Sequence, residues 1–404
     1  MQVLIERGAG LDVHKKTVVA CWFDGHEPTS RAVKRTFGTF RWQLQELRDW
    51  LLRAGCTHVA MESTGVYWQP VHRVLEDHFQ IILGNARHMA NVPGRKTDMN
   101  DAEWIATLLQ HGLIRPNFIP PKAVRELREL TRYRRKLVQT TTAAQLRVDK
   151  LLQSANIKLS SVASELFGVS GRRMLRSLAS GVTDARALAE LSRGKLRPKR
   201  DQLVQALSGN FTAEHARLLA IQLEMIERVE ASVAELEHLI EEKASPYQSS
   251  ITQLDAVPGI NRTIAVDVLA EIGTDMTSWP THRHFAAWAG LCPGNRESAG
   301  RRRRTRTRDG NPFLKSILVQ AATSARKRRG SYLAARFQRL SRRRGERVAT
   351  VAVAHELAVS IYYMLLRNEP YREPAAADPQ HARDKRKTQL LRQLHRLGYD
   401  VVIA

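Results

Sequence analysis

Hydrophobic and polar positions along the first 121 residues follow the periods of strands and helices in alternation. The stretch AGLDVHKKTVVACWFDG at 9–25 alternates and is rich in Val, which predicts strand structure running into a hairpin at Asp24-Gly25. RAVKRTF at 31–37 predicts the next strand. The pattern of FRWQLQELRDWLLRAG at 40–55 is instead that of an amphipathic helix, which Gly55 ends.

The rest of this first part predicts two further strands, each followed by a helix. The strands are THVAMES at 57–63 and QIILGN at 80–85, and the helices begin near Thr64 and Asp98, the second running to Gln110. Three strands, a helix, a strand, a helix, a strand and a helix is the element order of an RNase H-like fold. We therefore expect residues 1–121 to form an α/β domain of this class.

After Pro120-Pro121 the period becomes helical, so the remainder is predicted to be all-α. Residues 122–153 place an apolar seam on one face, and an arginine stripe repeats at 3,4,3 spacing on the opposite face; the stripe is Arg125, Arg128, Arg132 and Arg135. We expect the stripe to lie along phosphates. Apolar positions at 212–243 fit a heptad, which predicts a coiled coil or an antiparallel hairpin with the first long helix. Packing within one chain and dimerisation both account for this pattern.

These changes of period divide the chain into four parts. They are the α/β domain 1–121, a helical coiled-coil region 122–250, a mostly helical C-terminal domain 251–345 and a helical tail 346–404. The third part opens with LDAVPGI at 254–260, a Pro-Gly turn before an apolar helix. Such a turn resembles a helix-hairpin-helix element, whose backbone amides can hold a phosphate.

The charge of the chain points to a polyanionic partner. The formal net charge is +24, and residues 301–350 alone contain 15 Arg and 2 Lys against two acids. Self-repulsion of this size destabilises a compact chain unless an anion neutralises it, so we expect nucleic acid. Three scattered cysteines argue against a disulfide framework or a zinc site. The apolar stretch 351–366 is too short to span a bilayer, and we expect a cytoplasmic, nucleoid-associated protein without a membrane partner.

Four carboxylates fall where an RNase H-like fold would gather them. Asp12 is central in the first strand and Glu62 ends the fourth, while Asp98 and Asp101 are three apart on the last helix and so share a face. Carboxylate oxygens are hard ligands suited to Mg²⁺ or Mn²⁺. Each acid also has a simpler explanation, such as an edge-strand charge for Asp12 or a helix N-cap for Asp98. The four together, in this order, favour a catalytic metal site.

The segments GLDVHK, MESTGVYW and RKTDMNDAEWIA, with FAAWAGLCPGNRESAGRRRR and RDGNPFLKSILVQAA far downstream, carry a family resemblance. The chain resembles the insertion-sequence 110/1111 family of DEDD transposases over nearly its whole length. The resemblance implies a RuvC-like N-terminal domain whose metal-binding tetrad is Asp12, Glu62, Asp98 and Asp101. It also implies a serine nucleophile in the C-terminal domain. The family's frequent Ser-Ser-Gly reads Ser-Ala-Gly here, which leaves Ser298 for that role.

The resemblance further implies how the reaction proceeds and what it needs. Ser298 would cleave a DNA strand, hold its end as a phosphoserine and rejoin it to a new partner. A structured RNA encoded beside the gene (a bridge RNA) would pair with donor and target DNA. Joining two duplexes favours a dimer or a tetramer. Arginines that follow the serine would hold phosphates; these are Arg301, Arg302, Arg303, Arg304, Arg306 and Arg308.

Two other functions fit parts of this pattern. A hydrolytic, RuvC-like junction-resolving nuclease would use the same acidic cluster with water and would need neither Ser298 nor a guide RNA. A non-enzymatic nucleic-acid-binding protein would bind without its acids. The non-enzymatic function is disfavoured, because a buried acidic tetrad has little use in a protein built to bind phosphate.

Overall fold

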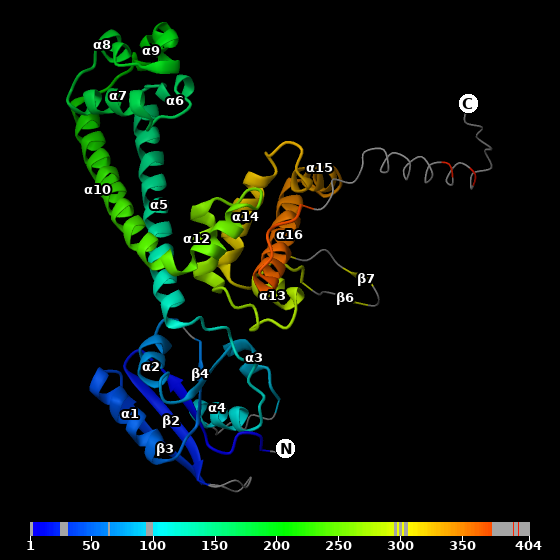
Figure 1. The fold of residues 1–404 in the computed structure, drawn as a ribbon. Helices are drawn as coiled ribbons and strands as arrows, with labels where there is room; N and C mark the ends of the chain where they lie inside the picture. The colour runs from blue at the N-terminus through cyan, green and yellow to red at the C-terminus, as the bar shows by residue number, and fades with distance from the viewer. Residues whose placement is uncertain are drawn as a thin grey trace. The chain divides into compact units, whose positions relative to one another are not determined.

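The computed structural model describes residues 3–24, 31–63, 65–93, 100–294, 297–298, 301–302 and 306–373, together with residues 391 and 395. The chain forms two compact units, residues 1–119 and 120–404, and Figure 1 traces the elements of each. The helix expected at 384–398 lies almost wholly outside the described residues.

The first unit is built on a five-stranded mixed sheet with the order β3-β2-β1-β4-β5. Its strands are β1 (Gly8–Val13), β2 (Thr17–Asp24), β3 (Arg31–Gly38), β4 (His58–Glu62) and β5 (Gln80–Gly84). The first three strands pair antiparallel, and β1, β4 and β5 pair parallel. Within 9–25 a tight turn separates β1 from β2, where His14 N donates to Thr17 O (2.9 Å). The predicted order of strands and helices is confirmed except for one short helix at Ala86–Ala90, which the pattern did not predict.

Helices cover both faces of this sheet. Alternate strand residues point to opposite faces, so each face contributes its own set of buried side chains. Leu11 and Met61 belong to the core beneath α1 (Arg41–Arg53) and α2 (Trp68–Leu75). On the other face Ala60 packs against α4 (Asp101–Gln110), and the short α3 (Ala86–Ala90) supplies Met89 to the same cluster. This alternation sends residues 10, 12, 60 and 62 to the α4 side.

Helix α4 begins three residues later than the pattern predicts. Asn100 has extended backbone (φ −65°, ψ 148°), and its side chain accepts a hydrogen bond from Ala102 N (2.9 Å) as the N-cap. The helix therefore starts at Asp101. The prediction that Asp98 and Asp101 share a face of this helix is wrong, because the extended residue Asn100 precedes its first turn. Asp98 itself lies outside the described residues.

The second unit begins with a long helical hairpin. Helices α5 (Lys122–Ser154) and α10 (Ala213–Ala244) run side by side in opposite directions (Figure 1). Short helices close one end of the hairpin, and they are α6 (Leu159–Val162), α7 (Val169–Ala179), α8 (Ala185–Glu190), η1 (Gly194–Lys199) and α9 (Arg200–Leu207). Val148 of α5 and Leu219 and Ile226 of α10 are buried in their shared core. The predicted antiparallel hairpin within one chain is confirmed.

The remaining helices pack together, and α12 contacts the N-terminal half of α5. They are η2 (Ser245–Tyr247), α11 (Gln248–Asp255), α12 (Arg262–Ile272), α13 (His282–Trp288), α14 (Pro312–Ala325), α15 (Tyr332–Arg344) and α16 (Glu346–Arg367). Among the described residues, only α16 is long and apolar enough to cross a membrane, and half of its apolar window is buried inside the protein. Its contacts with α13, α14 and α15 account for its apolar character.

The Pro-Gly turn between α11 and α12 packs inward. Gly259 has a positive φ (+89°), and a Cβ there would lie 2.4 Å from Ala321 O of α14. The Asn261 side chain accepts from Ile264 N (3.0 Å) and so takes up an amide at the start of α12. Two helices joined by a Pro-Gly turn lie where the sequence resembles a helix-hairpin-helix element, while the use of this turn as a phosphate site stays a prediction.

Candidate functional site

Two of the four expected carboxylates lie at the same edge of the sheet. Strands β1 and β4 are parallel and in register up to the Leu11–Met61 pair, so Asp12 and Glu62 follow on adjacent strands. Both carboxylates leave the sheet on the side that α4 covers. Gly10 permits this arrangement, because a Cβ there would lie 2.3 Å from Ala102 O and from Ala106 N of α4. The missing side chain therefore lets α4 cross β1 at backbone distance.

Asp101 brings a third carboxylate to this point as the first residue of α4. Burial raises the pKa of the Asp12 carboxyl above its ordinary value; His14 opposes this shift, while Asp101 and then Glu62 add to it. The Asp12 carboxyl therefore lies within range of the charges of Asp101 and Glu62. His14 Nε2 lies 3.1 Å from Asp12 Oδ2, and this contact is exposed to solvent.

The donor chemistry of this cluster suits a hard divalent cation. Oxygen ligands from carboxylates are those that Mg²⁺ and Mn²⁺ prefer, and a cation would offset the cost of burying the Asp12 charge, which is the main cause of its raised pKa, together with the smaller repulsion from Asp101 and Glu62. Among the residues that the structure describes, no three His, Cys, Asp or Glu side chains stand close enough to hold a metal ion. The fourth expected ligand, Asp98, is not among those residues. The metal site stays a prediction.

Ser298 lies on a narrow two-stranded ribbon of the second unit. Strands β6 (Glu297–Ser298) and β7 (Arg301–Arg302) pair antiparallel, with Ser298 opposite Arg301. Further from the tip, Gly294 N donates to Arg306 O and Arg308 N donates to Cys292 O (both 2.9 Å). The side chain of Ser298 and those of residues 301–305 lie outside the described part, and Arg306 and Arg308 are exposed. The nucleophilic and phosphate-binding roles stay predictions.

The two histidines nearest to Ser298 in sequence are engaged elsewhere. His282 Nδ1 lies 2.9 Å from the Tyr363 hydroxyl of α16, and its ring packs against the same tyrosine. His284 Nδ1 lies 2.8 Å from Thr281 Oγ1 at the start of α13. Both rings therefore have partners within the helical packing.

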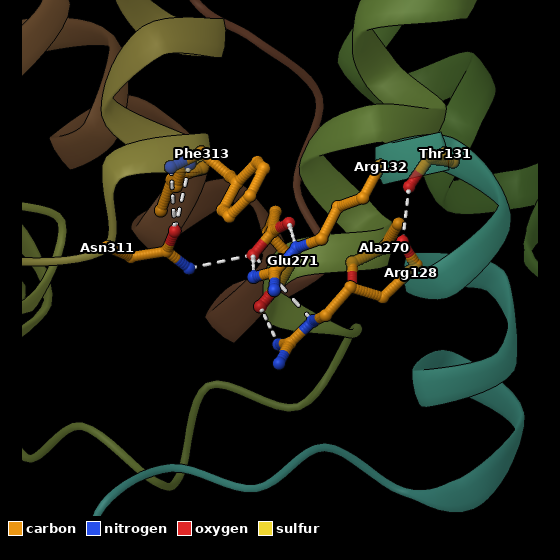
Figure 2. Close-up of polar contacts among 8 residues, drawn as sticks. Arg128, Thr131, Arg132, Ala270, Glu271, Asn311 and Phe313 are labelled. Carbon is orange, nitrogen blue, oxygen red and sulfur yellow. Dashed lines mark hydrogen bonds and ion pairs between the residues drawn. The ribbon is translucent and has the colours of Figure 1, made fainter. Parts of the chain in front are cut away.

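The arginine stripe of α5 does not form the open phosphate-binding face that its spacing predicts. Figure 2 shows that Arg128 and Arg132 point into the protein toward Glu271 at the end of α12. Arg132 donates to both carboxylate oxygens of Glu271 (2.7 and 2.8 Å), and Arg128 donates to Ala270 O (3.0 Å) and to the Glu271 carbonyl. Burial lowers the pKa of Arg128 to about 10, against the opposing effect of Glu271, so it stays charged at neutral pH.

The other two members of the stripe also have partners inside this unit. Arg125 donates to Pro120 O (3.0 Å), and Arg135 donates to the Ser316 hydroxyl of α14. Arg128 and Arg132 lie on a face that α12 and α14 cover, and their role in binding phosphate stays a prediction. The periodicity correctly gave a face but not what lies against it.

Glu271 is a residue that the sequence reasoning missed. It is 1% exposed, and besides the two arginines it accepts a hydrogen bond from Asn311 Nδ2 (2.7 Å; Figure 2). The only sequence signal was the presence of two acids, Asp267 and Glu271, within the apolar helix RTIAVDVLAEIG, which marks buried charges in need of partners.

Comparison with known proteins relates both units to transposases. A family model described as Transposase (DEDD_Tnp_IS110) matches residues 9–157, and one described as Transposase IS116/IS110/IS902 family matches residues 251–338. The chain is built from IS110-family transposase domains. It is 26% identical to the Probable family 20 transposase of Pseudomonas aeruginosa over 373 residues, 90% of this chain and 98% of that protein. It is 24% identical to the Transposase for insertion sequence element IS1111A of Coxiella burnetii, over 80% of each.

The two matched ranges each contain one set of candidate functional groups. The first contains the sheet except for Gly8, the residues Asp12, Glu62 and Asp101, and α5, and the second runs from within α11 to within α15 and includes the ribbon of Ser298. The chain is thus similar to transposases, which are DNA-processing enzymes, over both ranges, and its candidate groups occur in both matched parts.

Proposed function

We propose that this transposase is an RNA-guided DNA recombinase that cleaves and rejoins strands through a covalent Ser298–DNA intermediate. The observation that supports the proposal is the placement of Asp12 and Glu62 at the ends of adjacent parallel strands, with Asp101 at the start of α4, which crosses β1, in a sheet ordered as in RuvC-like nucleases. Like-charged groups are gathered at such cost chiefly where a cation or a reaction uses them. The matched transposase domains give the reaction class.

The carboxylates and the serine divide the chemistry between them. Asp12, Glu62, Asp98 and Asp101 would hold one or two Mg²⁺ or Mn²⁺ ions, which neutralise charge on the scissile phosphate when bound. Ser298 Oγ attacks the phosphorus, an Oγ–P bond forms, and one strand P–O bond breaks. The proton lost from the serine hydroxyl is matched by one gained by the released strand end. Attack by another strand end reverses these steps, so the phosphodiester energy is conserved.

Arginine supplies the electrostatic support of this scheme. The six arginines at 301–304, 306 and 308 follow Ser298 directly, and their fork-shaped guanidinium groups suit bidentate contacts with phosphate oxygens. The net charge of +24 fits a complex that contains RNA as well as DNA, because both are polyanions. The guide RNA and a dimeric or tetrameric assembly rest on the family resemblance.

Purified protein, its flanking DNA ends and the RNA transcribed beside its gene test the proposal. Strand cleavage is expected with Mg²⁺ and not with a chelator, and it should be lost in both Asp12→Asn and Ser298→Ala. Omitting the RNA should remove sequence-selective cleavage. Cleavage that persists in Ser298→Ala but not in Asp12→Asn would instead identify a hydrolytic nuclease.

A further inference from the structure

Asn311 joins the returning strand of the Ser298 ribbon to the helices. Its backbone N donates to Trp288 O (2.8 Å), at the point where the outgoing strand leaves α13. Its side-chain Oδ1 accepts from Phe313 N (3.0 Å) and Leu314 N (3.2 Å), which starts α14. The remaining Nδ2 donates to Glu271 Oε2 (2.7 Å). One side chain thus fixes the ribbon base to two helices.

Glu271 is a rigid acceptor for this bond. Its carboxylate is almost fully buried and is held by Arg132 through both oxygens. The Arg132 guanidinium also lies 3.9 Å from the centre of the Phe313 ring in the first turn of α14. Figure 2 shows these side chains converging from α5, α12 and α14. A carboxylate held in this way does not adjust when its partner moves.

The ribbon base has little room to move independently of Asn311. A Cβ on Gly310 would lie 2.3 Å from Gly290 N, so the two strands touch through their backbones at this level. The bonds from Arg308 N to Cys292 O and from Gly294 N to Arg306 O continue the pairing toward the tip. The described backbone bonds thus connect Asn311 to the ribbon as far as the Gly294–Arg306 pair.

We infer that the Glu271–Asn311 hydrogen bond sets the position from which Ser298 attacks DNA. Glu271 and Asn311 are then positioning residues, since neither is the nucleophile or a metal ligand. The inference rests on the proposed serine chemistry and adds the group that aims it. Small displacements of a reacting atom are costly, which is why a buried, charge-clamped anchor at the base is useful.

A polarity swap separates positioning from helix capping. Asn311→Asp keeps an equally good N-cap for α14 but loses the Nδ2 donor and sets a second carboxylate against Glu271. The double variant Glu271→Gln with Asn311→Asp restores an amide–carboxylate bond in the opposite direction; the amide oxygen at position 271 keeps the bond from Arg132 Nε, and the carboxylate at position 311 replaces the lost negative charge near Arg132. Asp184→Asn, at the N-cap of the remote helix α8, is the matched control for an exchange of these residue types.

The full-length protein is expressed with the DNA that flanks its gene, and two quantities are measured. These are the yield of protein-linked DNA after denaturing washes and the hydrogen exchange of the Gly294, Arg308 and Asn311 amides. Asn311→Asp should lower the yield and speed the exchange by at least about tenfold, the double variant should recover to within about threefold of wild type, and Asp184→Asn should match wild type.

Two results overturn the inference in different ways. If the wild type forms the adduct and Asn311→Asp forms it equally well, or if the double variant recovers nothing, the Glu271–Asn311 bond does not position the serine and the proposed function stands. If the wild type forms no adduct, the serine mechanism itself fails, whatever the exchange rates show.

Discussion

Replacing Gly10 with alanine tests how the fold brings the carboxylates together. A Cβ at position 10 would lie 2.3 Å from Ala102 O and from Ala106 N, whereas ordinary contact begins at 3.4 Å. Both atoms are helix backbone, so α4 must move by about 1 Å and must carry Asp101 away from Asp12. We expect Gly10→Ala to lower the free energy of unfolding by about 1–3 kcal/mol. Metal-dependent strand cleavage should fall by about 100-fold, a usual cost of a displacement of about 1 Å.

Gly8→Ala is the matched control in the same strand. A Cβ at position 8 would meet Leu109 Cδ2 at 2.7 Å, and that atom ends a flexible side chain that can turn aside. Urea denaturation followed by circular dichroism gives the stabilities, and cleavage of labelled DNA ends at fixed Mg²⁺ gives the activities. Equal losses in Gly8→Ala and Gly10→Ala would refute the claim that close packing of α4 on β1 sets the carboxylate geometry.

Four further outcomes follow from the same contacts. Glu271→Ala leaves Arg128 and Arg132 without their buried partner and should cost roughly 3–5 kcal/mol in urea denaturation, against less than about 1 kcal/mol for Glu241→Ala, which removes the exposed partner of Arg262. Burial raises the pKa of Asp267 to about 6 despite Arg134 and Arg135. The folded state therefore holds this proton more tightly than the unfolded state, and the stability that it contributes is lost as pH rises from about 4 to 6; Asp267→Asn should flatten that part of the curve of melting temperature against pH. Because the pKa of Asp12 is also raised, its ionised form destabilises the fold. Asp12→Asn should then raise the melting temperature at neutral pH in metal-free buffer, and a fall would contradict the burial of that charge. Arg306→Gln with Arg308→Gln should flatten the slope of log affinity against log salt by about 1 for each lost phosphate contact, measured by DNA-binding titration, and an unchanged slope would place these arginines off the DNA.

The alternation of residue types was sufficient to predict the sheet and its helices. The Val-rich alternating stretch 9–25 and the short strand segments after it became β1 to β5, and the heptad of residues 212–243 became one arm of the α5–α10 hairpin. The pattern placed the start of α4 too early, because apolar periodicity does not register a local cap such as Asn100. A side chain that accepts a hydrogen bond from a backbone amide of the first turn fixes the start of the helix, whatever the pattern of the residues before it.

The candidate site was only partly predictable, for a different reason. Asp12 and Glu62 follow from strand order alone, because parallel neighbours end at one edge of the sheet. The partnership of Arg132 with Glu271 joins residues 139 positions apart and depends on which helix packs on which. Spacing along α5 defines a face but carries no record of what covers it. An arginine stripe therefore looks the same in sequence whether it meets phosphate or a buried carboxylate.

Mapping the covalent link between this transposase and DNA tests the central claim most directly. Protein expressed with its flanking DNA is washed under denaturing conditions, treated with nuclease and protease, and analysed by mass spectrometry for peptides that carry a nucleotide. We expect a nucleotide on Ser298, absent in both Ser298→Ala and Asp12→Asn. A nucleotide on another residue, or strand cleavage in the same cells that leaves no modified peptide and persists in Ser298→Ala, would contradict the serine mechanism.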